Sequence, residues 1–165
     1  MAEKTIALLG QPNSGKSTLF NGLTGSRQHV GNWPGKTVER KDGFFSYNDV
    51  TYKIVDLPGT YSLSANSDEE VVTRNYISSG EANLVCILAD ASQLNRSLFM
   101  LADYAGIHVP VVLLLNMMDI AEGQGKKINV AGLQKSLGIP VVPMVAADKK
   151  QYQPFFNLLE NLEKR

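Results

Sequence analysis

Residues 10 to 17 combine two spaced glycines with a lysine and a serine, a set that could hold phosphate groups. They read Gly10-Gln11-Pro12-Asn13-Ser14-Gly15-Lys16-Ser17. Glycines let the backbone curl so that successive N–H groups point at phosphate oxygens, and a following helix adds a partial positive charge. Lys16 could reach the outer phosphates, and the Ser17 hydroxyl could bind Mg²⁺. The pattern predicts a site for a nucleoside triphosphate with magnesium, and eight matched positions disfavour a plain glycine-rich turn.

A second short motif, Asp56-Leu57-Pro58-Gly59, closes an expected strand. An aspartate at a strand end can hold Mg²⁺ through water, and the Gly59 N–H can meet the γ-phosphate. The motif is weak alone and gains weight from its place one hairpin after the phosphate loop.

A third motif, Asn116-Met117-Met118-Asp119, follows another expected strand and bears on the base. Guanine presents two neighbouring N–H donors, and one carboxylate can accept both. Adenine has an acceptor there, so binding it would leave the Asp119 carboxylate unpaired. We therefore predict guanine, and the alternative role for Asp119 is that of a helix cap.

Two weaker signals complete the set. The stretch 26–43 is long for a connection, and such connections are usually functional. It carries Gly35-Lys36-Thr37, whose threonine could complete the Mg²⁺ shell while a γ-phosphate is present and be released with it. The alternative is a β-forming residue that enters the next hairpin. Val145-Ala146-Ala147-Asp148 follows a late strand, where small residues would let a backbone N–H approach the guanine oxygen.

Alternating apolar strands and helical patterns must position these motifs, and they predict an α/β fold. The sheet is expected to be mostly parallel with helices on both faces, and a hairpin turn at Asn48-Asp49 supplies one antiparallel edge strand. Ligands bind beyond the carboxyl ends of such strands. Six strands are expected, at 4–9, 43–47, 51–56, 83–89, 110–115 and 140–145. Helices are expected at 18–23, after a capping box at 67–70, along 94–105, at 130–137 and along 155–162.

Composition narrows the function classes. The 165 residues suit one domain, and 16 basic residues balance 16 acidic ones, which argues against a nucleic-acid partner. The single cysteine, Cys86, lies in an apolar run and is expected to be core rather than nucleophile. We find no signal peptide and no apolar run of the length that a bilayer requires, so we expect a cytoplasmic domain.

In this order the five elements resemble a Ras-like GTP-binding (G) domain of the P-loop class. The resemblance goes further in three strings, and these are similar to the bacterial ferrous-iron transporter FeoB family. The strings are Val30-Gly31-Asn32-Trp33-Pro34-Gly35 with Thr37-Val38-Glu39, Asp56-Leu57-Pro58-Gly59-Thr60-Tyr61-Ser62-Leu63, and Asn116-Met117-Met118-Asp119. The likeness covers nearly the whole chain.

This resemblance implies a three-layer fold and a single G domain over 1–165, without the helical and transmembrane regions that follow in the family. It implies a cytoplasmic nucleotide switch that regulates ferrous iron transport, at the cytoplasmic face of the inner membrane in the full-length protein. Its partners would be GTP or GDP, those two regions and a further copy in a homo-oligomer. Alternatives are a non-catalytic GTP/GDP-binding module and a ribosome- or RNA-associated GTPase.

Hydrolysis is expected to be slow, because Thr60 stands where Ras-like enzymes place a water-orienting glutamine. Related GTPases with asparagine at the position of Asn13 are activated by potassium. The resemblance implies that the Asn13 side chain and the carbonyls of Gly31 and Trp33 could hold K⁺ against the phosphates. The alternative is that Asn13 only braces the phosphate loop.

Two departures from the family pattern stand out. Lys36 replaces an aliphatic residue, and Ala146-Ala147-Asp148 replaces a loop whose serine hydroxyl steadies the base site. The second departure bears on base affinity.

The expected site can now be stated. Catalytic roles are assigned to Asn13, Lys16, Thr37 and Gly59. Mg²⁺ ligands are Ser17, Thr37 and, through water, Asp56, and K⁺ ligands are Asn13, Gly31 and Trp33. Nucleotide contacts are expected from Gly10, Gln11, Pro12, Asn13, Ser14, Gly15, Lys16, Ser17, Thr18, Gly35, Lys36, Thr37, Asp56, Leu57, Pro58, Gly59, Asn116, Met117, Asp119, Val145, Ala146 and Ala147.

Overall fold

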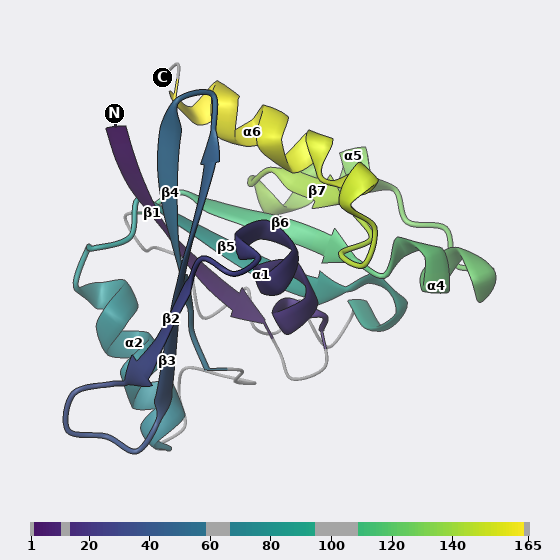
Figure 1. Cartoon of the computed structure of the whole chain (residues 1–165). Coiled ribbons are helices and arrows are strands. Elements are labelled where there is room, and N and C mark those ends of the chain that lie inside the picture. The colour runs from purple at the N-terminus through teal and green to yellow at the C-terminus, as the bar shows by residue number, and fades with distance from the viewer. Residues whose placement is uncertain (1, 11–13, 59–66, 95–108, 164–165) are drawn as a thin grey trace.

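The structure is a computed structural model and describes residues 2–10, 14–58, 67–94 and 109–163. Seven strands form one sheet with helices on both faces (Figure 1). The strands are β1 (Ala2–Gly10), β2 (Gln28–Asn32), β3 (Glu39–Tyr47), β4 (Val50–Asp56), β5 (Leu84–Asp90), β6 (Val111–Asn116) and β7 (Val141–Pro143). The helices are α1 (Lys16–Thr24), α2 (Asp68–Ser78), α4 (Met118–Gly123), α5 (Val130–Leu137) and α6 (Gln153–Glu163), with short 3-10 turns η1 (Ala91–Gln93) and η2 (Lys149–Gln151).

The strand order is β2-β3-β4-β1-β5-β6-β7. The pairs from β4 to β7 are parallel, whereas β2 pairs antiparallel with β3 and β3 pairs antiparallel with β4. The α/β class and the mostly parallel sheet are confirmed. The expected count of six strands was wrong, because there are seven. In the described sheet the one strand that runs against the others is β3, but it does not lie at the edge as expected, because β2 pairs with its outer side.

The extra strand lies in the stretch 26–43, which we expected to be a connection without structure of its own. Instead β2 folds back on a β3 that begins four residues earlier than expected, and together they form a long hairpin. The reason is visible in the exposure pattern. All but the first residue of β2 are exposed, so the strand carries no apolar alternation that could announce it.

Alternate residues of the central strands feed two cores, as parallel strands covered on both faces require. In β1, Ala7 and Leu9 join the core under α2 and α5, whereas Ile6 and Leu8 join the core under α1 and α6. Cys86 belongs to the second core and is fully buried, which raises the pKa of its thiol above the ordinary range. The expectation that Cys86 is a core residue is confirmed.

Local signals hold at several element ends. The two hairpin residues Asn48 and Asp49 both have positive φ, as a tight two-residue turn requires. Ser67 caps α2 by accepting a bond from the Glu70 N–H, and Gly138 ends α5 in the left-handed region. The apolar stripe of α6 packs into the core with Phe155 and Leu159 fully buried. Within the described residues, no helix is both long and apolar enough to cross a membrane.

Candidate nucleotide site

The phosphate loop joins the end of β1 to the start of α1, where the sequence placed it. Gly15 has φ of +93°, and a Cβ there would lie 2.2 Å from the Asn116 Nδ2. At Gly10 a Cβ would lie 2.6 Å from the Ser14 Oγ and 3.1 Å from a carbonyl oxygen of β5. Gly15 is therefore required by its positive φ and by the lack of space for a Cβ. Gly10 is required by the lack of space alone. Gln11, Pro12 and Asn13 lie outside the described residues.

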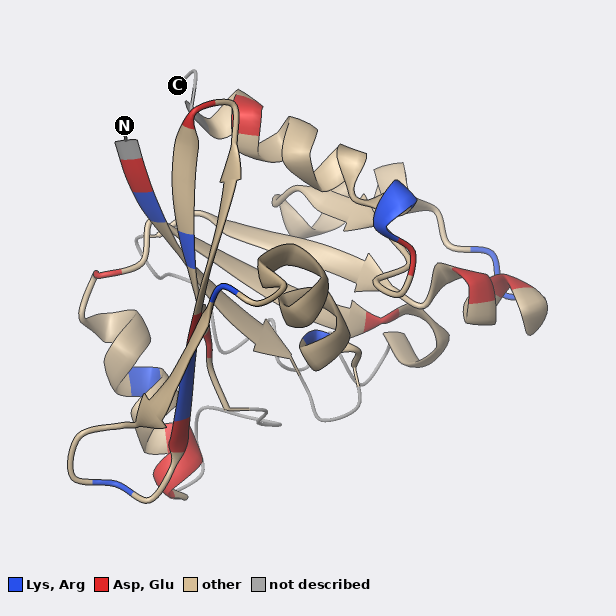
Figure 2. Cartoon of the chain, viewed as in Figure 1, with Lys and Arg blue, Asp and Glu red and all other residues tan. Residues whose placement is uncertain are grey.

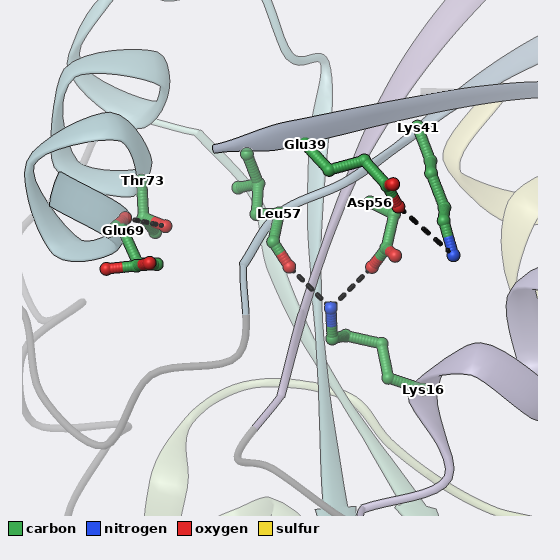
Figure 3. Close-up of polar contacts among 7 residues, drawn as sticks. All are labelled: Lys16, Glu39, Lys41, Asp56, Leu57, Glu69 and Thr73. Atoms are coloured by element: carbon green, nitrogen blue, oxygen red, sulfur yellow. Dashed lines mark hydrogen bonds and ion pairs between the residues drawn. The ribbon is translucent and has the colours of Figure 1, made fainter. Parts of the chain in front are cut away.

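Lys16 begins α1 and reaches across to the end of β4 (Figure 3). Its Nζ lies 2.5 Å from the Asp56 Oδ1 and 2.5 Å from the Leu57 carbonyl oxygen. Both side chains of this ion pair are mostly buried, with 13% and 12% exposed. The predicted phosphate ligand and the predicted magnesium carboxylate thus lie together, and each neutralises the other. Gly59, the last residue of that motif, lies outside the described residues.

Asn116 ties the site together from the end of β6. Its side chain is 3% exposed. Its Nδ2 donates to the Ser14 carbonyl at 2.9 Å, 102 residues away along the chain, and its Oδ1 accepts from the Ala146 N–H at 2.7 Å. One buried amide therefore fixes the phosphate loop against the loop expected to meet the base. Sequence reasoning did not find this role; the one available signal was a polar residue at the end of a fully apolar strand.

The loop after β7 is steadied by contacts that the sequence did not reveal. The Tyr152 hydroxyl donates to the Ala146 carbonyl at 2.6 Å, and the Asp148 N–H donates to the Val145 carbonyl at 3.0 Å. Burial raises the pKa of the Tyr152 hydroxyl, so it stays a donor at neutral pH. Ala146 is buried and Ala147 is exposed. The loop is therefore held at Ala146 by two bonds, one accepted by Asn116 and one donated by Tyr152.

Asp119 stands in the first turn of α4, and its side chain is exposed. It makes no hydrogen bond or ion pair with the described part of the chain. The cap of α4 is Met117, which turns the chain with φ of +61°. The alternative reading of Asp119 as the helix cap was wrong. The left-handed turn at Met117 directs the chain from the sheet edge into α4 and leaves the Asp119 carboxylate free to accept donors.

The remaining predicted ligands lie elsewhere. Residues 33–38 form the tip of the β2–β3 hairpin, which lies beside α2 and away from the start of α1 (Figure 1). Thr37 is exposed at this tip. Asp56 is the ladder partner of Lys41 on β3. Lys41 follows Thr37 by four residues, so Thr37 lies roughly 13 Å along the extended chain from the partner of Asp56. In this conformation the structure does not bring Thr37 together with Ser17 and Asp56.

The two carbonyls assigned to potassium are on the same hairpin. Gly31 is the ladder partner of Arg40, and the Trp33 carbonyl accepts from the Lys36 N–H at 3.0 Å. Lys36 also lies 3.4 Å from the Asp68 carboxylate. The Trp33 side chain is buried. The described residues of the predicted site are therefore divided between the ends of the parallel strands and the hairpin.

The β3 strand carries charges of both signs. Acidic and basic residues both occur along β3 (Figure 2), where Glu39, Arg40, Lys41 and Asp42 follow one another. Arg40 pairs with Asp42 at 2.9 Å, and Lys41 lies 3.6 Å from Glu39. Nothing in this hairpin forms the one-signed stripe that a polyanion would require.

Comparison with known proteins decides the family. The family model described as Ferrous iron transport protein B matches residues 4–159. The chain belongs to the FeoB family. It is 50% identical over 150 residues to the Fe(2+) transporter FeoB of Escherichia coli K12, an alignment that covers 88% of this chain and 19% of that protein. The chain thus spans about a fifth of the length of the curated relatives that it matches.

Two solved FeoB structures place the chain within the family. The G domain of the T. maritima FeoB iron transporter superposes with a TM-score of 0.82 at 44% identity, covering 87% of this chain and 88% of that one. The cytosolic domain of the same transporter in its GMPPNP form gives a TM-score of 0.88 at 41% identity, covering 96% and 61%. The chain corresponds to the N-terminal G domain of FeoB.

Proposed function

We propose that this chain binds GTP and GDP with Mg²⁺ and hydrolyses GTP slowly. The observation that carries the proposal is the buried Asn116 amide, which joins the phosphate loop to the base loop while leaving the Asp119 carboxylate free beside them. These contacts support a phosphate site and a guanine acceptor at the same ends of the strands. A relative in its GMPPNP form, a GTP analogue, supports the assignment.

The chain's own residues supply most of the binding. Lys16 would leave Asp56 for the outer phosphates, and a charged hydrogen bond of this kind contributes about 1.5–3 kcal/mol. Ser17 is exposed in the first turn of α1, and with Asp56 it offers the oxygen donors that Mg²⁺ prefers. The bound ion would neutralise charge that develops on the phosphates. Asp119 would accept the two N–H groups of guanine.

The catalytic part of the proposal is a slow, potassium-activated hydrolysis. Thr60 is too short to orient the attacking water as glutamine does. A monovalent cation held by Asn13 and the carbonyls of Gly31 and Trp33 would stabilise charge on the transferring phosphoryl. Because Gly31 lies in β2 and Trp33 at the hairpin tip, this site forms only if the end of the hairpin moves toward the sheet edge.

In the whole protein, we infer that the domain is a single unit over 1–165 at the cytoplasmic face of the inner membrane. Its nucleotide state would regulate ferrous iron transport through the helical and transmembrane regions of the full-length relatives. The identity to the E. coli transporter supports this role. A homo-oligomer belongs to the same proposal.

The deciding experiment measures GTP turnover in KCl and in NaCl. We expect faster turnover in KCl and loss of this difference in Asn13→Ala. Equal rates in the two salts would remove the potassium role. Nucleotide binding without single-turnover hydrolysis in either salt would favour a non-catalytic binding module.

Base choice has a separate test. Asp119→Asn should shift preference from GTP toward XTP, because xanthine offers a carbonyl where guanine has its amino group. A variant that still prefers GTP would show that Asp119 does not contact the base.

A further inference from the structure

The side chain that begins the hairpin tip is packed against α2, on the other face of the sheet from α1. Trp33 is 7% exposed, and its ring meets the edge of the Tyr76 ring at 5.5 Å with an angle of 70° between the planes. The Trp33 Nε1 is buried without a hydrogen-bond partner among the described residues. The contact therefore depends on aromatic packing, and this unpaired N–H opposes it. Such a contact can hold the tip on α2 and can also be broken.

Arg40 closes this contact from the strand that follows the tip. Its guanidinium lies 4.5 Å from the centre of the Trp33 ring and 5.8 Å from that of Tyr76. Two bonds to Asp42, at 2.9 and 3.2 Å, fix the plane of the guanidinium. Asp42 also lies 3.6 Å from Lys53 on β4. The arginine is thus oriented by the sheet and holds Trp33 against α2 by a cation–π contact.

The same tip carries the groups that the proposed reaction needs. The backbone N–H of Trp33 donates to the Val38 carbonyl at 3.0 Å, and the backbone carbonyl of Trp33 accepts from the Lys36 N–H. Thr37 lies between these bonds and is exposed. While Trp33 stays against Tyr76, the tip that carries its carbonyl is held on α2, and the tip has to leave α2 before this carbonyl can reach a cation at the phosphates.

We propose that Trp33, Tyr76 and Arg40 form a latch that holds the hairpin tip on α2 and must open before the tip completes the catalytic site. Arg40 and Tyr76 are then positioning residues, because they act through Trp33 and do not touch the nucleotide. This inference rests on the proposed GTPase function. It adds that the free energy that keeps the latch closed sets the K⁺ concentration at which GTP turnover is half-maximal.

The potassium requirement follows from population arithmetic. If only a small fraction of molecules has the tip released, the apparent affinity for K⁺ is reduced by that fraction. Weakening the latch enlarges the released fraction. We therefore expect latch variants to reach half-maximal GTP turnover at about three- to tenfold lower K⁺ concentration. A merely structural role for Arg40 or Tyr76 would lower turnover without moving this concentration downward.

The first test uses Trp33 itself, which is the only tryptophan of the chain. Its emission and its quenching by acrylamide are measured without nucleotide, with GDP and Mg²⁺, and with GMPPNP, Mg²⁺ and K⁺. We expect a shielded tryptophan in the first two states. In the third we expect a red-shifted emission that acrylamide quenches more strongly. Equal shielding in all three states, with GMPPNP bound by calorimetry, would overturn the latch and leave the proposed function standing.

The second test compares variants in K⁺ titrations of GTP turnover. Tyr76→Ala removes the ring, whereas Tyr76→Phe keeps it and should retain the wild-type K⁺ requirement. Arg40→Lys keeps a cation for Asp42 but loses the flat stacking face, so it should shift the requirement even if Arg40→Ala does not fold. The matched control is Tyr47→Ala, at the other end of β3, where the ring stacks on Phe156 at 4.9 Å.

The outcomes separate cleanly. A lower K⁺ requirement in Tyr76→Ala and Arg40→Lys, but not in Tyr76→Phe or Tyr47→Ala, supports the latch. An unchanged or higher requirement in both latch variants overturns it while leaving potassium activation in place. Failure of the wild-type chain to bind GTP would overturn the proposed function, and the latch with it.

Discussion

The sheet edge at the ends of β1, β4, β6 and β7 and the tip of the β2–β3 hairpin carry parts of the same predicted site, yet they are held in different ways. At the edge, the nearly fully buried Asn116 amide bonds to the phosphate loop 102 residues away and to the base loop 30 residues away, and a mostly buried lysine pairs with a carboxylate of another strand. At the tip, the contacts include a short turn, an aromatic cluster and an exposed ion pair between Lys36 and Asp68, and Thr37 is exposed.

The difference suggests that the two regions have different roles in binding the nucleotide. Groups that bind the constant parts of a nucleotide can be fixed in advance, because their partners are the same in every state. Groups that meet a γ-phosphate or a cation must be able to leave, because that phosphate is lost on hydrolysis. The molecule is therefore expected to be rigid where it selects the ligand and weakly held where it responds to the ligand.

The largest effect should come from Asn116→Ala, which tests the rigidity of the edge. It leaves the Ser14 carbonyl and the Ala146 N–H without their partner, and each buried group left unpaired costs about 1–3 kcal/mol. We expect chemical denaturation to show a stability loss of about 2–4 kcal/mol, and calorimetry to show weaker binding of GTP and GDP alike.

The matched control is Asn83→Ala at the opposite edge of the sheet. Asn83 accepts one exposed bond, from the Thr5 N–H at 2.8 Å. Its loss should cost about 1 kcal/mol or less and leave nucleotide affinity unchanged. Equal losses in the two variants would contradict a special role for the Asn116 bridge.

Lys16→Ala should come next, and it separates the phosphate contact from the base contact. Losing one charge-assisted bond predicts roughly a 10- to 150-fold weaker affinity for GTP, with little change for guanosine, measured by titration calorimetry. Lys53→Ala is the control, since Lys53 also faces an aspartate but on the α2 side of the sheet. If Lys53→Ala weakened GTP binding as much, the effect would be one of general charge.

Thr37→Ala addresses the tip and should have a smaller and more selective effect. We expect it to weaken Mg²⁺-dependent binding of GMPPNP by about tenfold, the loss of roughly one hydrogen bond to a charged group. GDP affinity and thermal stability should stay near wild type, because Thr37 is exposed. The control is Ser46→Ala, which removes an exposed hydroxyl from β3, away from the tip. Parallel losses for GMPPNP and GDP would mean that Thr37 does not sense the γ-phosphate.

The smallest effect concerns Cys86, a probe of the rigid core. At pH values below its pKa of about 8.5, an exposed thiol reacts about tenfold faster with iodoacetamide for each unit by which the pH is raised, because the thiolate is the reacting form. Burial raises the pKa of the Cys86 thiol above that value, so the thiol stays protonated and labelling should change little between pH 7 and 9. Deprotonation favours the unfolded chain, whose thiol pKa is lower, so this stability contribution is complete below pH 8.5 and declines above it. Fast, pH-dependent labelling of the folded chain would contradict the burial.

Much of the fold was predictable because its signals are local. The apolar runs of β5 and β6, the turn at Asn48-Asp49 and the stripe of α6 each follow from a few neighbouring residues. β2 was missed for the opposite reason. None of its residues is buried, and it is defined by backbone pairing with β3, which leaves no apolar pattern in the sequence.

The sequence by itself determined which chemistry is predicted for the site, since the motifs expected to bind phosphate, Mg²⁺ and guanine each lie within four to eight adjacent residues. Only the tertiary structure decided how they are joined and which of them are apart. The Asn116 bridge, the Tyr152 bond to Ala146 and the packing of Trp33 on Tyr76 all connect residues that are distant along the chain or belong to different elements. Such contacts depend on where the sheet brings side chains together, and no local pattern encodes that.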